Sequence, residues 1–180
     1  IAEGPFAITG SLTLKGGEGD DTFNLDSLAA DLNLDLGING QDGANDILNL
    51  NSALSTTSTS SVSFNTETIN LNAGSITSAG SQYYSGNVVL GANTTIDAGD
   101  QLFLEGTVSG AFTLDVSAVG LIAFFENITT SGLTANSSGF LNMEPDVEIN
   151  AGAGDISLTA DAPIGLASLT TTGNVDITSV

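Results

Sequence analysis

The sequence contains no cysteine, histidine, arginine or tryptophan, and Lys15 is its single basic side chain. Without cysteine, the chain can form neither disulfides nor thiolate metal sites. Binding to nucleic acid or to an anionic membrane surface depends on many Lys and Arg residues, so both partners are excluded. No apolar run approaches the length of a membrane span, and no membrane insertion is expected.

The same absences argue against an enzyme. Serine catalysis lacks its histidine base, and a polysaccharide lyase lacks an Arg or His to take a proton from its substrate. Glycoside hydrolysis needs only two carboxylates, but no acidic pair is accompanied by a tryptophan platform for a sugar. We therefore expect a non-catalytic protein. An ice-binding surface is not expected either, because threonine pairs such as Thr94-Thr95 and Thr129-Thr130 recur too irregularly.

Acidic residues dominate the little charge that is present. The 21 Asp and Glu residues give a formal net charge of −20, although only 12% of all residues are charged. The mean hydropathy is +0.24, so the chain has enough apolar residues to build a core. Like charges at this density repel one another strongly at low ionic strength. Bound divalent cations would relieve that repulsion, which is a first indication of calcium.

Short runs of alternating apolar and polar residues fill most of the chain. Examples are 32–36, 102–104, 112–116 and 175–177. Alternation with period two puts one face of a strand in the core and the other in water. Clusters of Gly, Asn, Asp and Ser separate the runs at intervals of about ten residues, which is typical of an all-β sandwich, barrel or solenoid.

Internal repeats favour the solenoid. The segments 23–26, 48–51 and 69–72 share the pattern apolar-Asn-Leu-Asn/Asp. Stacked coils would place the repeated leucines in an inner column and the asparagines in an outer one, where their amides can bond along the axis. Asparagine is also simply a frequent polar residue in acidic β proteins.

Two other patterns repeat at longer or less regular intervals. Ser-Gly pairs precede apolar residues at 85–90, 109–114 and 138–141, and Ala-Gly-Asp precedes Leu102 and Ile156. Together the repeats predict a parallel β-solenoid, a right-handed β-helix, with irregular coils of roughly 20 to roughly 29 residues. The whole chain, 1–180, is expected to form one solenoid segment, with acidic coils in 1–75 and a different type of repeat in 76–180.

One local motif carries chemistry. The segment 16–24, Gly-Gly-Glu-Gly-Asp-Asp-Thr-Phe-Asn, matches the nonapeptide G-G-x-G-x-D-x-U-x at every specified position. This segment resembles the calcium-binding repeat of the repeats-in-toxin proteins, in which turn carbonyls and the aspartate that matches Asp21 face the ion. A looser copy follows at 39–48, with Asp46 in the place of Asp21. Because the nonapeptides are not in tandem here, the compact roll of that family cannot form.

A coil as long as the spacing between Phe23 and Leu48 would nevertheless lay the second acidic turn on the first. We therefore predict a Ca2+ site made of Asp20, Asp21, Asp42, Asp46 and nearby carbonyls, since calcium accepts irregular oxygen shells. The alternative is a pair of Gly/Asp turns without an ion, because turns prefer these residues in any case.

The later part of the chain resembles another group of proteins. The segments 82–96 and 104–110 look like repeats of giant bacterial haemagglutinin-like, β-strand-repeat surface adhesins. That resemblance covers about 75–180 and implies a right-handed β-helical shaft, extracellular or on the bacterial cell surface, with no defined ligand site. The run Leu121–Phe125 is more apolar than the usual unit and predicts either a fully buried strand or an exposed adhesive patch.

Two functions follow as expectations. The first is a calcium-stiffened shaft within a large surface or secreted adhesin, whose partners are neighbouring repeats and host or surface glycans. The second is a subunit of a self-assembling extracellular fibre or sheath, in which copies of the chain join by β-strand addition.

Overall fold

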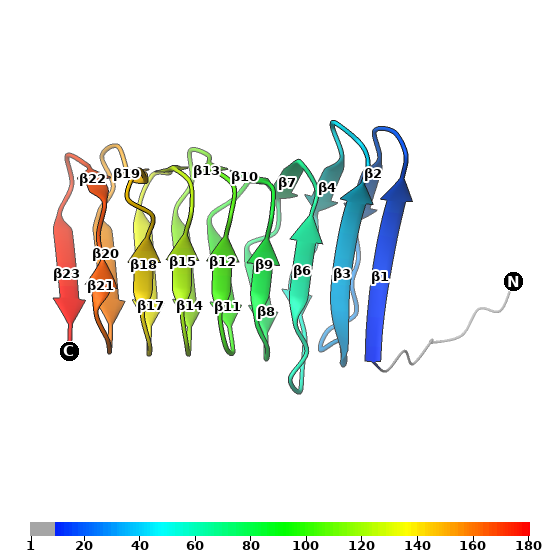
Figure 1. Ribbon diagram of the computed structural model, residues 1–180, viewed down its shortest axis with the longest axis horizontal. Helices are drawn as coiled ribbons and strands as arrows, with labels where there is room; N and C mark the ends of the chain where they lie inside the picture. The colour runs from blue at the N-terminus through cyan, green and yellow to red at the C-terminus, as the bar shows by residue number, and fades with distance from the viewer. Residues whose placement is uncertain (1–9) are drawn as a thin grey trace, which may run out of the picture.

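The computed structural model describes residues 10–180, and throughout this range it forms a parallel β-solenoid of strands and turns without a helix (Figure 1). None of the described residues therefore belongs to a helix long and apolar enough to cross a bilayer. The strands make three sheets that run the length of the stack, here called sheets A, B and C.

Sheet A has the order β1-β3-β6-β9-β12-β15-β18-β21. Its strands are β1 (Gly10–Gly17), β3 (Leu34–Gln41), β6 (Val62–Asn65), β9 (Gln82–Tyr84), β12 (Leu102–Leu104), β15 (Ile122–Phe124), β18 (Leu141–Met143) and β21 (Ile164–Gly165). Sheet B has the order β2-β4-β7-β10-β13-β16-β19-β22. Its strands are β2 (Thr22–Leu25), β4 (Ile47–Leu50), β7 (Thr68–Leu71), β10 (Asn87–Leu90), β13 (Val108–Ser109), β16 (Ile128–Thr129), β19 (Glu148–Asn150) and β22 (Ser168–Thr170).

Sheet C has the order β5-β8-β11-β14-β17-β20-β23. Its strands are β5 (Leu54–Ser55), β8 (Ser75–Ser78), β11 (Thr94–Ala98), β14 (Leu114–Ala118), β17 (Leu133–Ser137), β20 (Ile156–Ala160) and β23 (Val175–Ser179). One strand from each sheet makes a coil, so β3, β4 and β5 form coil 2 and β21, β22 and β23 form coil 8. Coil 1 contributes β1, β2 and an isolated bridge from Leu32 to Thr56.

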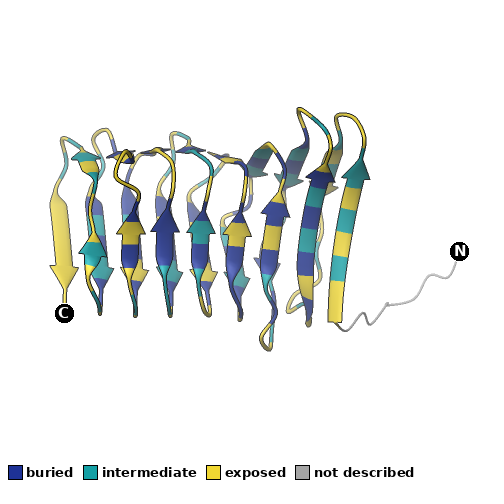
Figure 2. Ribbon diagram, viewed as in Figure 1, coloured by how far each residue is buried: buried dark blue, intermediate teal, exposed yellow. Residues whose placement is uncertain are grey.

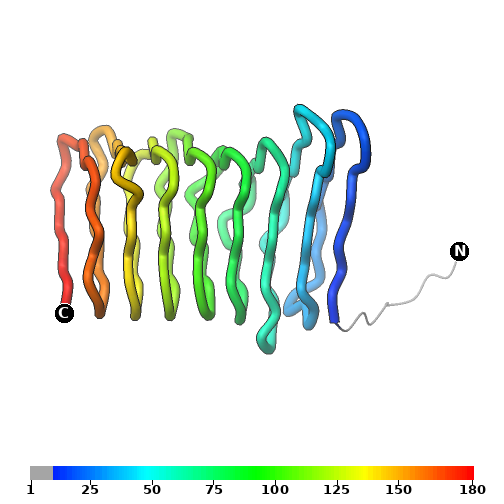
Figure 3. The backbone as a smooth tube through the Cα atoms, viewed as in Figure 1, coloured from blue at the N-terminus to red at the C-terminus, as the bar shows by residue number. Residues whose placement is uncertain are grey.

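Every strand pairs in parallel with the strand one coil away, and the coils differ in length. Leu36 aligns with Val62 in an early, long coil, whereas Ile122 aligns with Leu141 in a later, shorter one. The predicted parallel β-solenoid is thus confirmed. Figure 3 shows the longer turns in the first coils, after which the backbone path becomes more uniform.

A single hydrophobic core runs along the inside of the stack (Figure 2). It extends from Leu34 to Ala160 and is built by the inward residues of all three sheets. Because each coil is covered by its neighbours, a stack of this kind is stable without disulfides.

The inner leucine column lies as the first repeat predicts. Leu25 aligns with Leu50, and Leu50 with Leu71. The two other repeats do not mark equivalent positions, because they combine different sheets. Val88 belongs to sheet B and Leu114 to sheet C, while Leu102 and Ile156 belong to sheets A and C. Ser-Gly and Ala-Gly-Asp turns occur at more than one corner of the coil, so their spacing does not give the coil length.

Candidate metal centre

Two Gly/Asp turns lie one above the other where sheet A passes into sheet B. Before the turns, Gly17 aligns with Gln41, and after them Thr22 aligns with Ile47. The second turn is one residue longer, yet the strands that follow both turns are again in register. Asp21 and Asp46 therefore occupy equivalent positions in coils 1 and 2.

The two aspartates are joined through the backbone. The Asp21 N–H donates to Asp46 Oδ1 at 2.7 Å, and the Asp46 side chain is 0% exposed. The second oxygen of each carboxylate, Oδ2 of Asp21 and Oδ2 of Asp46, is buried without a hydrogen-bond partner. A buried carboxylate oxygen in this state carries a large desolvation cost unless a cation or a proton compensates it.

Glycines allow the backbone to pass directly against these carboxylates. A Cβ on Gly40 would meet the Asp46 carboxylate and would lie 2.5 Å from its Cβ, and a Cβ on Gly43 would lie 2.6 Å from Asp46 Oδ2. The Cβ on Gly43 would also meet the Gly19 carbonyl oxygen. A Cβ on Gly16 would meet Asp21 Oδ2 and lie 2.7 Å from the Gly40 carbonyl oxygen. Carboxylate and carbonyl oxygens thus gather around spaces that any side chain would fill.

Such an oxygen-rich cradle fits a hard cation such as Ca2+, which takes about six to eight oxygen ligands. Asp21, Asp46 and the carbonyls of Gly19 and Gly40 are the groups that could hold it. Within residues 10–180 no three or more Asp, Glu, His or Cys side chains converge as a metal cluster, so backbone carbonyls and water would have to complete the shell.

The other two predicted ligands lie outside this pair. Asp20 is exposed, and its Oδ2 accepts a hydrogen bond from the Asn45 amide at 3.2 Å. Asp42 is also exposed, and its N–H donates to the Gly17 carbonyl at 3.2 Å. The structure therefore brings the half-buried Asp21 and the buried Asp46 together and leaves Asp20 and Asp42 in the solvent-facing parts of the two turns.

Sequence reasoning missed Glu67, which continues the same column into coil 3. Its Oε2 accepts the Asp46 N–H at 2.8 Å, just as Asp46 accepts the N–H of Asp21. The signal was present in the repeats: Asp21, Asp46 and Glu67 each stand two residues before the first apolar residue of the Asn-Leu pattern.

The outer face of sheet B carries the predicted asparagine column beside this site. The Asn49 amide donates to Asn24 Oδ1 and the Asn70 amide to Asn49 Oδ1, both at 2.8 Å. A second column, which the repeats also imply but which was not predicted, runs through Asp26, Asn51 and Asn72 with bonds of 2.7 Å. Side-chain bonds along the axis thus reinforce the coils that contain the acidic turns.

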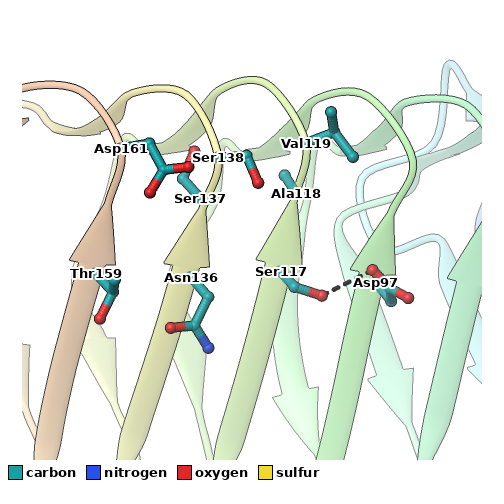
Figure 4. Close-up of a pocket in the computed structure, with 9 residues that line it drawn as sticks. All are labelled: Asp97, Ser117, Ala118, Val119, Asn136, Ser137, Ser138, Thr159 and Asp161. Atoms are coloured by element: carbon teal, nitrogen blue, oxygen red, sulfur yellow. Dashed lines mark hydrogen bonds between the residues drawn. The ribbon is translucent and has the colours of Figure 1, made fainter. Parts of the chain in front are cut away.

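A separate groove of about 350 Å³ lies on the outer face of sheet C (Figure 4). Asp97, Ser117, Asn136 and Thr159 follow one another along it in register. Ser117 Oγ donates to Asp97 Oδ1 at 2.7 Å. No predicted site residue lines this groove, and its hydroxyl, amide and carboxylate groups are those of an ordinary solvated sheet face.

Comparison of the chain with protein-family models, with curated proteins and with solved structures gives no match.

Proposed function

We propose that this chain is a rigid, non-catalytic spacer segment of a large bacterial surface or secreted adhesin, and that calcium stiffens its first coils. The observation that carries the proposal is the pair of buried Oδ2 atoms of Asp21 and Asp46, which have no hydrogen-bond partner. The uniform parallel stack of the later coils supports the spacer role, since neighbouring coils and a continuous core resist bending.

The pair explains why a cation would matter to rigidity. Two carboxylates brought together in a water-poor turn repel each other by several kcal/mol at intermediate dielectric. Calcium would turn this repulsion into attraction, and its binding free energy would stabilise only the folded chain. Asp21 belongs to coil 1 and Asp46 to coil 2, so an ion held by both resists their separation.

The composition suits an extracellular setting. A net charge of −20 is screened and partly neutralised where salt and divalent cations are abundant. The stack also needs no disulfide, because burial between coils supplies the stability that small secreted domains obtain from cysteines.

A second candidate is a subunit of an extracellular fibre or sheath. It is favoured by the main-chain ladders that join one coil to the next, such as that between β20 and β23, because the same type of bonding can join one copy to another. Neighbouring repeats, further copies of the chain, and host or surface glycans are the partners proposed for these two roles.

Calorimetric titration with calcium tests the proposal. The wild-type chain should take up calcium at millimolar or lower concentration, and Asp21→Ala should abolish the uptake. Asp176→Ala, which removes an equal charge from the exposed β23, should leave it intact. Absence of uptake by the wild type, or equal losses in both variants, would reduce the motif to two ordinary turns. Sedimentation of the same samples separates spacer from fibre, because only the fibre subunit grows into polymers.

A further inference from the structure

Sheet A carries a row of aromatic side chains on its outer face. Tyr83, Phe103 and Ala123 occupy one outward column of β9, β12 and β15. The rings of Tyr83 and Phe103 are stacked, with centroids 4.9 Å apart and planes 4° from parallel. Phe125 follows β15 and continues the row, its ring centroid 6.5 Å from that of Phe103. We call Tyr83, Phe103 and Phe125, together with Ala123, the aromatic stripe.

The stripe interrupts a polar column. Ser63 precedes Tyr83 in the register and Asn142 follows Ala123. Although Ala123 is in an outward position it is only 3% exposed, whereas Tyr83 and Phe125 remain 36% and 38% exposed. The expected buried strand is thus present at Ile122–Phe124, and the residue that follows it lies on the surface. Contiguous apolar patches on a polar surface commonly mark interaction sites.

Carboxylates stand near both ends of the strands that carry this stripe. Asp100 lies before β12 and Glu105 directly after it, while Glu126 directly follows Phe125. All three are exposed. The single cationic side chain of the sequence, Lys15, belongs to β1, at the first position of sheet A, three strands before β9. The border, here called the acidic rim, therefore has no basic side chain of residues 10–180 beside it.

We propose that the aromatic stripe and its acidic rim form a lateral docking face for a cationic, amphipathic polypeptide segment of another molecule. The apolar side chains of such a segment would cover the rings, and its Lys or Arg side chains would pair with Asp100, Glu105 and Glu126. Charge complementarity selects this occupant: a second copy of the chain would bring its own net charge of −20, and nucleic acid would bring phosphates. The inference goes beyond the spacer role, because it gives the spacer a partner along its side and does not depend on calcium.

The test uses a fluorescent synthetic peptide of alternating Lys and Leu, with oligolysine and a Glu-Leu peptide of equal length as probes for comparison. Fluorescence anisotropy at an ionic strength of about 0.15 M, where long-range attraction is screened, should show binding of the Lys-Leu peptide alone. Replacing Tyr83 and Phe103 by Ser should weaken it by about tenfold or more, as expected when interface anchors are removed. Val89→Ser, which removes a similarly exposed apolar side chain from β10 of sheet B, should not weaken it.

A second pair of variants tests the rim without disturbing the rings. Glu105→Gln with Glu126→Gln should weaken binding and flatten its salt dependence, whereas Asp115→Asn with Asp176→Asn, on sheet C, should not. The proposal is overturned by the absence of Lys-Leu binding, by oligolysine binding as tightly, or by equal losses in both pairs. It is also overturned if the stripe instead mediates self-association, seen as a dimer that the Tyr83/Phe103 variant abolishes.

Discussion

The Asp46 carboxylate of coil 2 accepts the backbone N–H of Asp21 in coil 1 through Oδ1, at 2.7 Å, while its Oδ2 is buried without a partner. Oδ1 thus has an ordinary structural role as a hydrogen-bond acceptor, whereas Oδ2 has none. A turn that merely needed a cap for the Asp21 N–H would be served as well by a neutral amide. The second oxygen is what makes this position a candidate ligand.

Asp46→Asn separates these two roles. The amide oxygen can still accept the Asp21 N–H, but one of the two neighbouring negative charges is removed. In EDTA the variant should therefore melt at the same temperature as the wild type or several degrees higher, because the repulsion is relieved. In calcium it should lack the rise in melting temperature expected of the wild type. Two results together would contradict this: a variant that melts lower than the wild type in EDTA, and a wild type whose melting temperature does not change with calcium. Asp46 would then serve only to accept the Asp21 N–H.

Gly40→Ala tests the tight approach of the backbone to that carboxylate. The added Cβ would lie 2.5 Å from Asp46 Cβ, so the variant should lose about 1–3 kcal/mol of unfolding free energy, as for overpacking in a core. Gly74→Ala is the matched control, because its nearest neighbour would be the Asn93 carbonyl oxygen at 3.4 Å. Urea unfolding measures both, and equal midpoints would contradict the packing described here.

The asparagine column should contribute to stability in proportion to its bonds. Asn49 makes two side-chain bonds and Asn24 one, and a net hydrogen bond contributes about 0.5–1.5 kcal/mol. Asn49→Ala should therefore cost roughly twice as much as Asn24→Ala in urea unfolding. Equal and negligible costs would mean that solvent competes successfully for these amides.

Tyr84 lies in the core with a polar partner of its own. Its hydroxyl donates to Gln82 Oε1 at 2.7 Å, and both side chains are 0% exposed. Burial raises the pKa of Tyr84 well above its ordinary value of 10.0. Because the folded chain holds the proton more tightly than the unfolded chain, this contribution to stability is complete below about pH 10 and is lost as the pH rises further.

Tyr84→Phe checks that account. The variant leaves Gln82 Oε1 without its donor and should cost about 1–3 kcal/mol at neutral pH. Above about pH 10 its stability should fall less steeply than that of the wild type. Urea unfolding across this pH range measures the free energy of unfolding of both proteins. If both values fall equally steeply, Tyr84 does not cause the loss of stability at alkaline pH.

The sequence alone was sufficient for the architecture and for the alignment of the two acidic turns. The alternation of apolar and polar residues places Leu25, Leu50 and Leu71 inside the stack. The asparagine before each of these leucines gives the register of the first coils. The same register predicts that Asp21 and Asp46 lie beside each other. The later coils could not be aligned in this way, because Ser-Gly turns occur at different corners and their spacing does not reveal which sheet follows.

The aromatic stripe could not be predicted for a similar reason. Tyr83 and Phe103 lie one short coil apart, and their stacking depends on that coil length, which the wider spacing of the Ser-Gly pairs obscured. Phe125 is out of step with them by two residues and reaches the row only because it follows Ala123 at the end of β15. Contacts of this kind depend on the local path of the backbone within a coil, so the repeat pattern of the sequence does not predict them.

We propose that calcium joins the first two coils through Asp21 and Asp46. Hydrogen–deuterium exchange of the whole chain, in calcium and in EDTA, tests it most directly, with the coils of residues 100–180 as an internal reference. We predict that EDTA accelerates exchange of the backbone amides in residues 16–50 and leaves the reference coils unchanged. Identical exchange of residues 16–50 in both solutions would contradict the claim.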